Sequence, residues 1–168
     1  MRSAGSDGLS PGGSGGPGQV LLVRCRPWLV ALPLADVVRI TDTEAGAAEG
    51  GVGAAEGGSI TFDGQAWRLA SLAVLLGTPR SGDANWEQPV AFVLTKPKHS
   101  AGLALATGRC LRVGPLPGVL VDLPACAFRH RRPTPCFPAG DLATTHGLAP
   151  FGLFLDPAVH FFPAPILP

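Results

Sequence analysis

Short apolar runs, each broken by Gly or Pro, follow one another along the chain from Gln19 onward. Such runs are typical of buried strands, because Gly is entropically costly inside a helix and Pro interrupts the helical hydrogen-bond ladder. The pattern predicts strands at Val20–Cys25, Trp28–Leu32, Ile60–Phe62, Ala66–Leu69, Pro89–Leu94, Ala101–Ala106, Cys110–Val113, Val119–Val121 and Phe151–Pro157. Many short strands at regular spacing predict a mostly β chain, built as one or two small β-barrels or a sandwich.

Three of these strand pairs have the form of hairpins. Arg26-Pro27 separates the first pair, and Lys96-Pro97-Lys98 separates the third. Between them, Asp63-Gly64 separates the second pair, and Asp-Gly is one of the dipeptides most typical of a two-residue hairpin turn. The sequence therefore predicts a tight hairpin over residues 60–69.

Three short helices are expected beside the strands. Pro33 suits the first turn of a helix, and the apolar face of that helix would consist of Leu34, Val37 and Val38. Ser71 can cap a second helix that Gly77 closes, with its apolar positions at Leu72, Leu75 and Leu76. The last is a single turn at Ala158–Phe162.

Low-complexity segments set the limits of a single domain. Residues 1–18 consist of Gly, Ser and Pro with few charges and are expected to be a disordered tail. Residues 44–58 contain GAAEGG twice and are expected to be a flexible insert. The domain itself is expected at 19–162, followed by a C-terminal tail at 163–168, and 168 residues suffice for one sizeable core.

The composition excludes several classes of protein. The net charge is +1, whereas a general nucleic-acid binder needs a clear basic excess. No apolar run approaches the ~18 residues of a membrane span, so no membrane insertion is expected. No apolar stretch follows Met1-Arg2 as in a secretory signal. We therefore expect a cytoplasmic protein with reduced thiols at Cys25, Cys110, Cys126 and Cys136.

No residues combine into a recognised catalytic or metal site. The only candidate zinc ligands have a spacing that fits none of the paired four-ligand arrangements: Cys126, His130 and Cys136. His99-Ser100 and Asp122 lack the G-x-S-x-G turn that presents a nucleophilic serine. The sequence therefore predicts no enzyme, no metal and no cofactor.

Aromatic and basic residues give the candidate contact points. Trp28 and Trp67 fall in predicted strands and are expected in the core, whereas Trp86 lies in a polar loop and suits an exposed partner contact. The basic run Phe128–Arg132 has the charge to hold phosphate or an acidic partner, but one such run is usually a solvated loop.

Four segments together resemble the CheW-like adaptor domains of bacterial chemotaxis signalling. Gly58–Gly77 is similar, without a gap, to the pattern G-L-I-N-L-R-G-Q-V-V-P-V-I-D-L-R-R-R-L-G. Val30–Arg39 is similar to Y-A-L-P-I-x-x-V-R-E. Val90–Leu94 with Gly102–Leu105 resembles the V-V-V-V…x-G-L-x-V-D hairpin, and Phe151–Asp156 resembles the closing x-L-L-L-D strand. The likeness covers about residues 19–162.

The resemblance implies a fold and a role. The fold would be two small five-stranded β-barrel subdomains packed together, with short helices, and the chain would cross between them. The role would be a non-enzymatic scaffold that links a CheA-type histidine kinase to methyl-accepting chemoreceptors. Partner contacts are expected at Phe62, Asp63, Gly64, Gln65 and Trp86. The alternative is a small β-barrel module that binds a ligand or protein outside chemotaxis, for which an apolar cavity with convergent polar groups would speak.

The chain departs from the family pattern where partners are expected. Asp63 stands where the pattern has Arg, and a carboxylate only accepts hydrogen bonds, so a partner group that bonds to the Arg would be repelled or unpaired. Ala106 stands where an acidic residue follows the G-L-x-V strand. We therefore expect receptor coupling to be altered or lost while the fold is kept.

Overall fold

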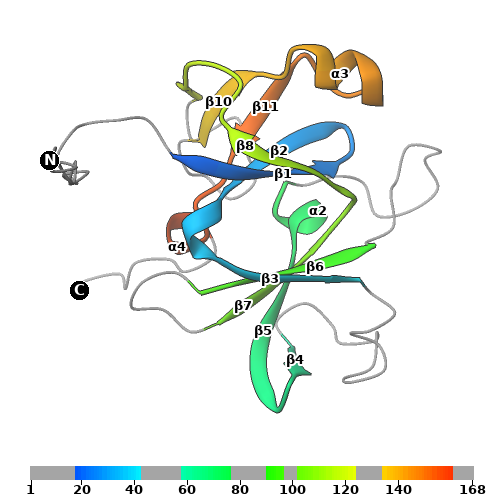
Figure 1. Ribbon diagram of the computed structural model, residues 1–168, viewed down its shortest axis with the longest axis vertical. Coiled ribbons are helices and arrows are strands. Elements are labelled where there is room, and N and C mark those ends of the chain that lie inside the picture. Colours follow the sequence, from blue (N-terminus) through cyan, green and yellow to red (C-terminus); the bar gives the residue numbers. More distant parts are fainter. Residues whose placement is uncertain (1–17, 43–57, 77–89, 97–101, 124–133, 161–168) are drawn as a thin grey trace, which may run out of the picture.

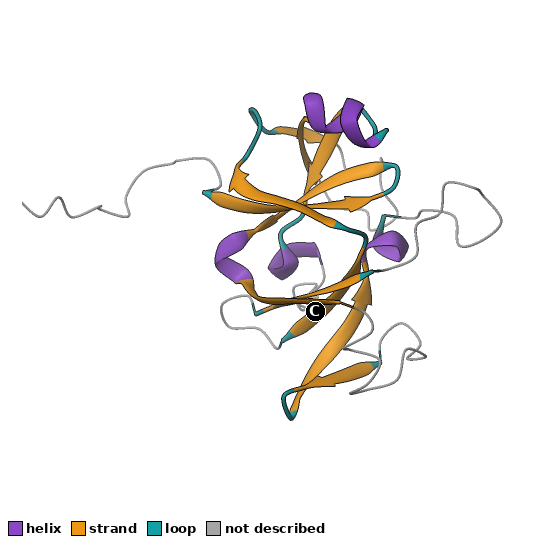
Figure 2. Cartoon of the chain, turned by 45° about the vertical axis from the view of Figure 1, so that its right-hand side comes forward, coloured by secondary structure: helices purple, strands orange, loops and turns teal. Residues whose placement is uncertain are grey.

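Two β-sheets with short helices form the structure, a computed structural model that describes residues 18–42, 58–76, 90–96, 102–123 and 134–160 (Figures 1 and 2). Sheet A has six strands, β8 (Cys110–Pro115), β1 (Gln19–Cys25), β2 (Trp28–Pro33), β11 (Phe151–Phe154), β10 (Thr134–Pro138) and β9 (Val121–Leu123), in this order. Sheet B has five, in the order β3 (Val37–Asp42), β6 (Ala91–Thr95), β7 (Leu103–Thr107), β5 (Gln65–Ser71) and β4 (Ser59–Phe62).

The chain crosses between the sheets twice. It leaves sheet A through the one-turn 3-10 helix η1 (Leu34–Asp36), builds sheet B from β3 to β7, and returns to sheet A with β8. All strand pairs are antiparallel except β2 with β11 and β5 with β7. The prediction of a mostly β fold in two packed units is therefore confirmed, with six strands in one sheet. Within the described ranges the outermost strands of each sheet do not pair with each other, so both sheets are curled and open.

The hydrophobic core has three layers that alternate with the two sheets. The central layer lies between the sheets and is filled from both, with Leu21 and Val30 from sheet A and Val93 and Leu105 from sheet B. The outer layer of sheet A contains Phe137, and the helix α3 (Asp141–His146) lies over that face (Figure 1). The third layer fills the inside of sheet B. Each sheet is therefore apolar on both faces.

This layering explains the continuous apolar runs in the sequence. Along β1, Leu21 and Val23 face the central layer, while Val20 and Leu22 face the outer layer. The strands β2, β6 and β7 divide their side chains between two layers in the same way. A strand with one solvated face would alternate apolar and polar residues, whereas a strand buried on both faces reads as an unbroken apolar run.

The first helix prediction was wrong beyond one turn. Leu34 begins the 3-10 turn η1, but Val37 and Val38 belong to the strand β3, which pairs with β6. β-branched side chains lose rotamer freedom in a helix and pack well on a sheet. The pairing with β6 thus gives Val37–Asp42 a hydrogen-bonded ladder that a short helix could not offer.

Two elements were missed in the C-terminal third of the chain. The strand β10 contains Pro135 and Pro138, and proline in a strand argues against a central position, yet β10 pairs with β9 and β11 on its two sides. Its buried side chains, Thr134 and Phe137, hold it in place. The helix α3, which ends at Gly147 with a left-handed φ of 63°, was also not expected.

The other short helices follow the sequence signals. The hydroxyl of Ser71 accepts a hydrogen bond from the backbone N–H of Val74, at 3.4 Å, and caps α2 (Leu72–Leu75) as predicted. α4 is a single turn at Pro157–His160, close to the predicted place. The Arg26-Pro27 peptide in the turn between β1 and β2 is cis.

Several expectations concern segments outside the described residues. These are the N-terminal tail apart from Gly18, the insert apart from Gly58, the C-terminal tail, Gly77, Trp86, His99-Ser100, Cys126 and the basic run at 128–132. They remain predictions. Within the described ranges no helix is long and apolar enough to cross a membrane.

Three described cysteines pack on the central layer: Cys25, Cys110 and Cys136. Burial raises the pKa of the Cys110 thiol, although a side-chain hydrogen bond with Thr107 acts in the opposite direction. Cys25 is fully buried, and Cys110 and Cys136 are half-buried.

Alkylation of Cys110 should therefore need a higher pH in the folded chain than in the unfolded chain. The thiolate is the reactive form, and a raised pKa delays its formation. Because the folded-state pKa exceeds the unfolded one, the contribution of this group to stability is complete at neutral pH and is lost as the pH rises through the folded-state value. Site-resolved mass spectrometry after short iodoacetamide pulses, with and without urea, would measure both midpoints. Equal midpoints in the two states would contradict the expectation.

Candidate partner-binding surface

The β4–β5 hairpin presents the predicted contact residues at its turn. Asp63 and Gly64 form a two-residue loop with φ angles of 50° and 76°. Positive φ at both central residues is the mark of a type I′ turn, which suits the twist of a hairpin and favours Asp-Gly. A Cβ on Gly64 would meet no atom of the described residues within 4 Å, so the backbone conformation rather than crowding calls for glycine.

The strands behind the turn anchor it in the interior of sheet B. Phe62 is 3% exposed and packs edge-on against Phe92, with ring centroids 5.8 Å apart. Trp67 on the second strand is also buried, as predicted, and both belong to the third core layer. Trp28, by contrast, is only half-buried and packs on Phe151.

The burial of Phe62 changes what this residue contributes. Its ring lies inside the sheet, so it fixes the hairpin and does not present a contact at the surface. Asp63, Gly64 and Gln65 are all exposed, so a partner that approaches the turn meets these three. The fifth expected contact, Trp86, lies outside the described residues.

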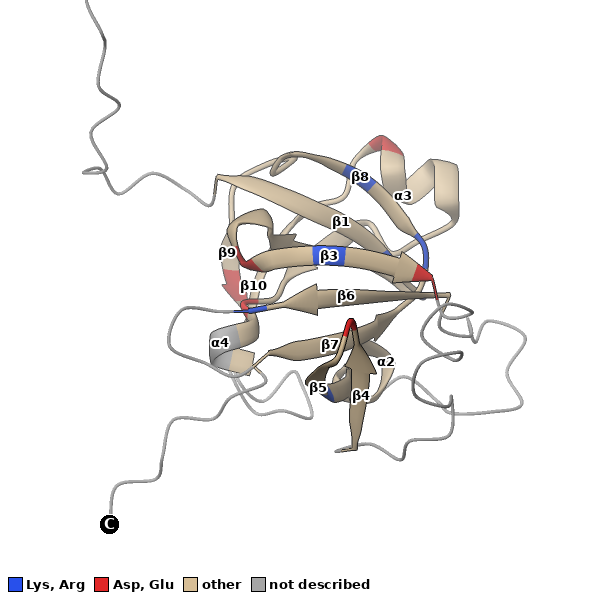
Figure 3. Cartoon of the chain, turned by 60° about the horizontal axis from the view of Figure 1, so that its bottom comes forward, with Lys and Arg blue, Asp and Glu red and all other residues tan. Residues whose placement is uncertain are grey.

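An ion pair links the hairpin turn to the far edge of the same sheet. The Arg39 guanidinium donates from Nη1 to Oδ2 of Asp63 at 2.5 Å. Arg39 lies in β3, the outermost strand at one end of sheet B, and the β4–β5 turn belongs to the other end. Figure 3 shows the acidic turn of the hairpin facing β6 and β3. The pair therefore spans the open side of the curled sheet.

A β-bulge explains why Arg39 points across this opening. Val37 pairs with Thr95 and Arg39 with Leu94, which leaves Val38 as the extra residue in the ladder. Residues directly opposite in a sheet share a face, and Leu94 faces the third core layer. Arg39 thus lies on the inner side of β3, from where it reaches Asp63. Sequence reasoning missed Arg39, because the two partners are 24 residues apart with no local signal to join them.

An exposed apolar side chain lies beside the ion pair in β3. Val38 is 59% exposed, whereas Ile40, which is 42% exposed, pairs with Val93 and lies on the opposite face of β3 from Arg39. We call the surface formed by Val38, Arg39, Asp63, Gly64 and Gln65 the hairpin-tip surface. It combines apolar area with a fixed pair of charges, a mixture that is typical of protein–protein contacts.

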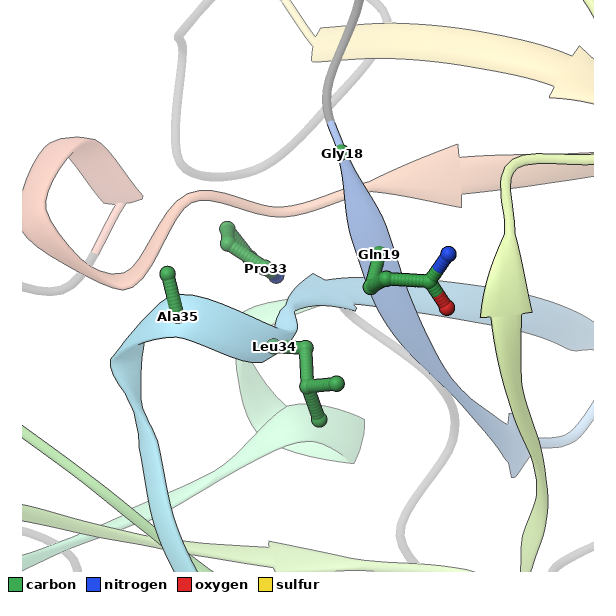
Figure 4. A pocket seen from close by; sticks show the side chains of 5 residues that line it. All are labelled: Gly18, Gln19, Pro33, Leu34 and Ala35. Atoms are coloured by element: carbon green, nitrogen blue, oxygen red, sulfur yellow. The ribbon is translucent and has the colours of Figure 1, made fainter. Parts of the chain in front are cut away.

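An open pocket lies elsewhere, where β1 begins beside η1 (Figure 4). Its volume is about 440 Å³, and it is lined by Gly18, Gln19, Pro33, Leu34 and Ala35. Gln19 is the one polar side chain among these lining residues, and its amide points away from Pro33 and Ala35. A small-molecule site needs several polar groups that converge on the ligand. The described lining does not supply them.

Side chains that could hold a metal ion do not gather in the described part of the chain. Among these residues no three His, Cys, Asp or Glu side chains come together as they would to hold a metal. Ala106, at the position where the CheW-like pattern is acidic, is half-buried on the third core layer. It contributes packing and no charge.

Comparison with known proteins gives likenesses to solved structures alone. No protein-family model matches the sequence, and no curated protein matches it. Among solved structures, the chain is similar to the scaffolding protein TtCheW from Thermoanaerobacter tengcongensis, with a TM-score of 0.45 and 15% sequence identity. The match covers 60% of this chain and 66% of the other, just under two thirds of its length. No conclusion about partners follows from a match at this level.

Proposed function

We propose that this chain is a non-enzymatic, cytoplasmic adaptor that resembles CheW and couples a CheA-type histidine kinase to chemoreceptors or related signalling partners. The observation that carries the proposal is the conformation of residues 59–76. They form a strand, a type I′ turn at Asp63-Gly64, a second strand and a short capped helix. This is the order of elements expected for the CheW-like segment that the sequence resembles.

The path of the chain supports the same proposal. The segment Val30–Arg39 leaves one sheet through Pro33 and a single helical turn and enters the other sheet. The strands β6 and β7 form the next antiparallel pair, and the closing strand β11 leads into α4. Apart from Val37–Arg39, which lie in β3 instead of a continued helix, the four segments that carry the resemblance have the order of elements expected for them.

The hairpin-tip surface gives the proposed adaptor its means of binding. Phe62 and Trp67, which are buried in the third core layer, anchor the strands on both sides of its turn. The exposed side chain of Val38 supplies apolar contact area. Binding through such a surface transmits a signal by bringing partners together and requires no catalytic group.

The reversed charge at Asp63 favours a related alternative. A turn that carries a carboxylate, where the family pattern has a guanidinium, cannot make the same contacts. The chain would then be a protein-binding module whose partner lies outside chemotaxis. The same surface would serve both roles, so identification of the partner separates them.

Binding assays with the full chain test the proposal. We expect saturable binding to a CheA-type kinase or to the signalling fragment of a chemoreceptor from the same organism, measured by biolayer interferometry, without turnover of ATP by the chain itself. Val38→Asp should weaken this binding by about tenfold or more, because it places a charge in an apolar contact. Val113→Asp is the matched control, since Val113 is 50% exposed on β8 of the other sheet.

Two results would contradict this proposal. Failure of the unmodified chain to bind any such kinase or receptor fragment would remove the chemotaxis role. Equal losses for Val38→Asp and Val113→Asp would remove the hairpin-tip surface as the site of contact.

A further inference from the structure

The ion pair between Arg39 and Asp63 exchanges the charges of the CheW-like pattern. That pattern has Glu at the position of Arg39 and Arg at the position of Asp63. In this chain both charges are reversed, and the two side chains are in contact. Reversal of either residue alone would have placed two like charges next to each other. In this chain the pair gives an attraction across the open side of sheet B, with the negative charge at the hairpin turn, where the pattern has a positive one.

The exchange also changes what the turn offers to another molecule. The Asp63 side chain is 73% exposed and that of Arg39 is 49% exposed, so a partner can reach both. An arginine at the turn donates hydrogen bonds in a planar fork, whereas an aspartate accepts them. The turn therefore suits a cationic hydrogen-bond donor, whereas an arginine there would suit an anionic acceptor.

We propose that the exchanged pair sets partner specificity. The turn docks a protein partner that presents a lysine or arginine to Asp63, and it rejects partners that present a carboxylate there. Like charges brought together at an interface cost binding energy, and opposite charges both steer and stabilise the encounter. Because this inference rests on the adaptor role proposed above, the partner is the kinase or receptor with which the chain is found to associate.

Charge-exchange variants of the full chain test the inference. Arg39→Glu with Asp63→Arg restores the polarity of the family pattern and keeps the pair. We expect this double variant to bind the chain's own partner about tenfold or more weakly than the unmodified chain. We also expect it to gain binding to a chemoreceptor signalling fragment from an organism whose adaptor carries Glu and Arg at these positions. Asp63→Asn should weaken binding to the own partner as well, and asparagine tolerates the positive φ of the turn.

A control with the same two charge reversals at another site shows whether the position of the reversed residues decides binding. Arg112→Glu with Asp122→Arg makes the same two substitutions at exposed positions of sheet A, on β8 and β9. This control should bind the own partner as the unmodified chain does. Thermal unfolding of the single and double variants shows whether the pair is formed, because each single reversal should lower the melting temperature and the double exchange should restore most of the loss.

The outcomes distinguish failure of the inference from failure of the proposed function. If the unmodified chain binds no kinase or receptor fragment, the adaptor role fails first. If it binds its own partner and the double exchange binds that partner equally well, the charges do not set specificity and the inference is overturned. Restored thermal stability without any change of partner preference also overturns it, since the pair then only closes the sheet.

Discussion

Replacement of Phe137 by alanine should lower the free energy of unfolding by about 3–5 kcal/mol, as expected for loss of a fully buried aromatic ring. Phe137 is 1% exposed and is among the largest fully buried side chains. It lies in β10 and packs in the outer core layer of sheet A with Val20, Leu22 and Leu29. Without the ring, β10 loses the contact that holds a proline-containing strand between β9 and β11.

Urea denaturation followed by circular dichroism would measure this loss. Phe137→Leu keeps most of the apolar volume and should cost clearly less. A loss for Phe137→Ala below about 1 kcal/mol would contradict the packing described here, because such values are typical of side chains that are not fully buried.

Gly152 provides an independent control on the same contact. A Cβ at this position would lie 2.4 Å from Cζ of Phe137 and 3.0 Å from the carbonyl oxygen of Leu29. Gly152→Ala should therefore cost about 1–3 kcal/mol in the unmodified chain. It should cost less in the Phe137→Ala background, where the ring is gone. Gly114→Ala, whose Cβ would meet no atom closer than 4.0 Å, serves as the neutral comparison.

Replacement of Trp67 by alanine should also cost about 3–5 kcal/mol. Trp67 is 4% exposed, and its indole fills the inside of sheet B beneath the hairpin turn. Gly102 leaves room for the indole, because a Cβ there would lie 2.5 Å from Cε3 of Trp67. Loss of the indole removes the support of the β4–β5 hairpin. We therefore expect weaker partner binding together with the loss of stability.

Trp67→Phe separates the volume of the indole from its polarity. The indole Nε1 is buried and finds no hydrogen-bond partner among the residues that the structure describes. An unsatisfied buried donor carries a desolvation penalty, so a phenylalanine removes this penalty while it keeps most of the packing. Its cost should be no more than about 1–2 kcal/mol, within the range of ordinary core substitutions. A cost for Trp67→Phe equal to that of Trp67→Ala would mean that the N–H makes a contact on which the fold depends.

Much of the fold was predictable where the deciding interactions are local. The turn at Asp63-Gly64 and the cap at Ser71 depend on backbone preferences that a few neighbouring residues carry. The strands β1, β2, β6 and β7 were predictable because a strand buried on both faces needs an unbroken apolar run, and such a run can be recognised in the sequence. The second strand of each of these pairs follows the first within a short connection.

Prediction failed where local signals were ambiguous or absent. Val37 and Val38 fit a helical face over one turn as well as they fit a strand, and the pairing with β6 decided between the two. The prolines of β10 argued against a strand there, although the buried Phe137 stabilises this strand through contacts with residues far away in the sequence. Phe62 was grouped with its neighbour Asp63 as an expected partner contact, and its ring is buried, because adjacent residues in a strand point to opposite faces.

The sequence by itself determined the strand-rich character of this protein, the position of its tightest turn and the absence of a strong net charge, since each depends on residue types or on neighbours along the chain. Only the tertiary structure decided which strands are buried on both faces, that Phe62 supports the hairpin from inside, and that Arg39 contacts Asp63. Those outcomes depend on sheet curvature and on contacts between distant segments. The residues next to a given residue in the sequence do not determine which distant residue it contacts once the sheet is curved.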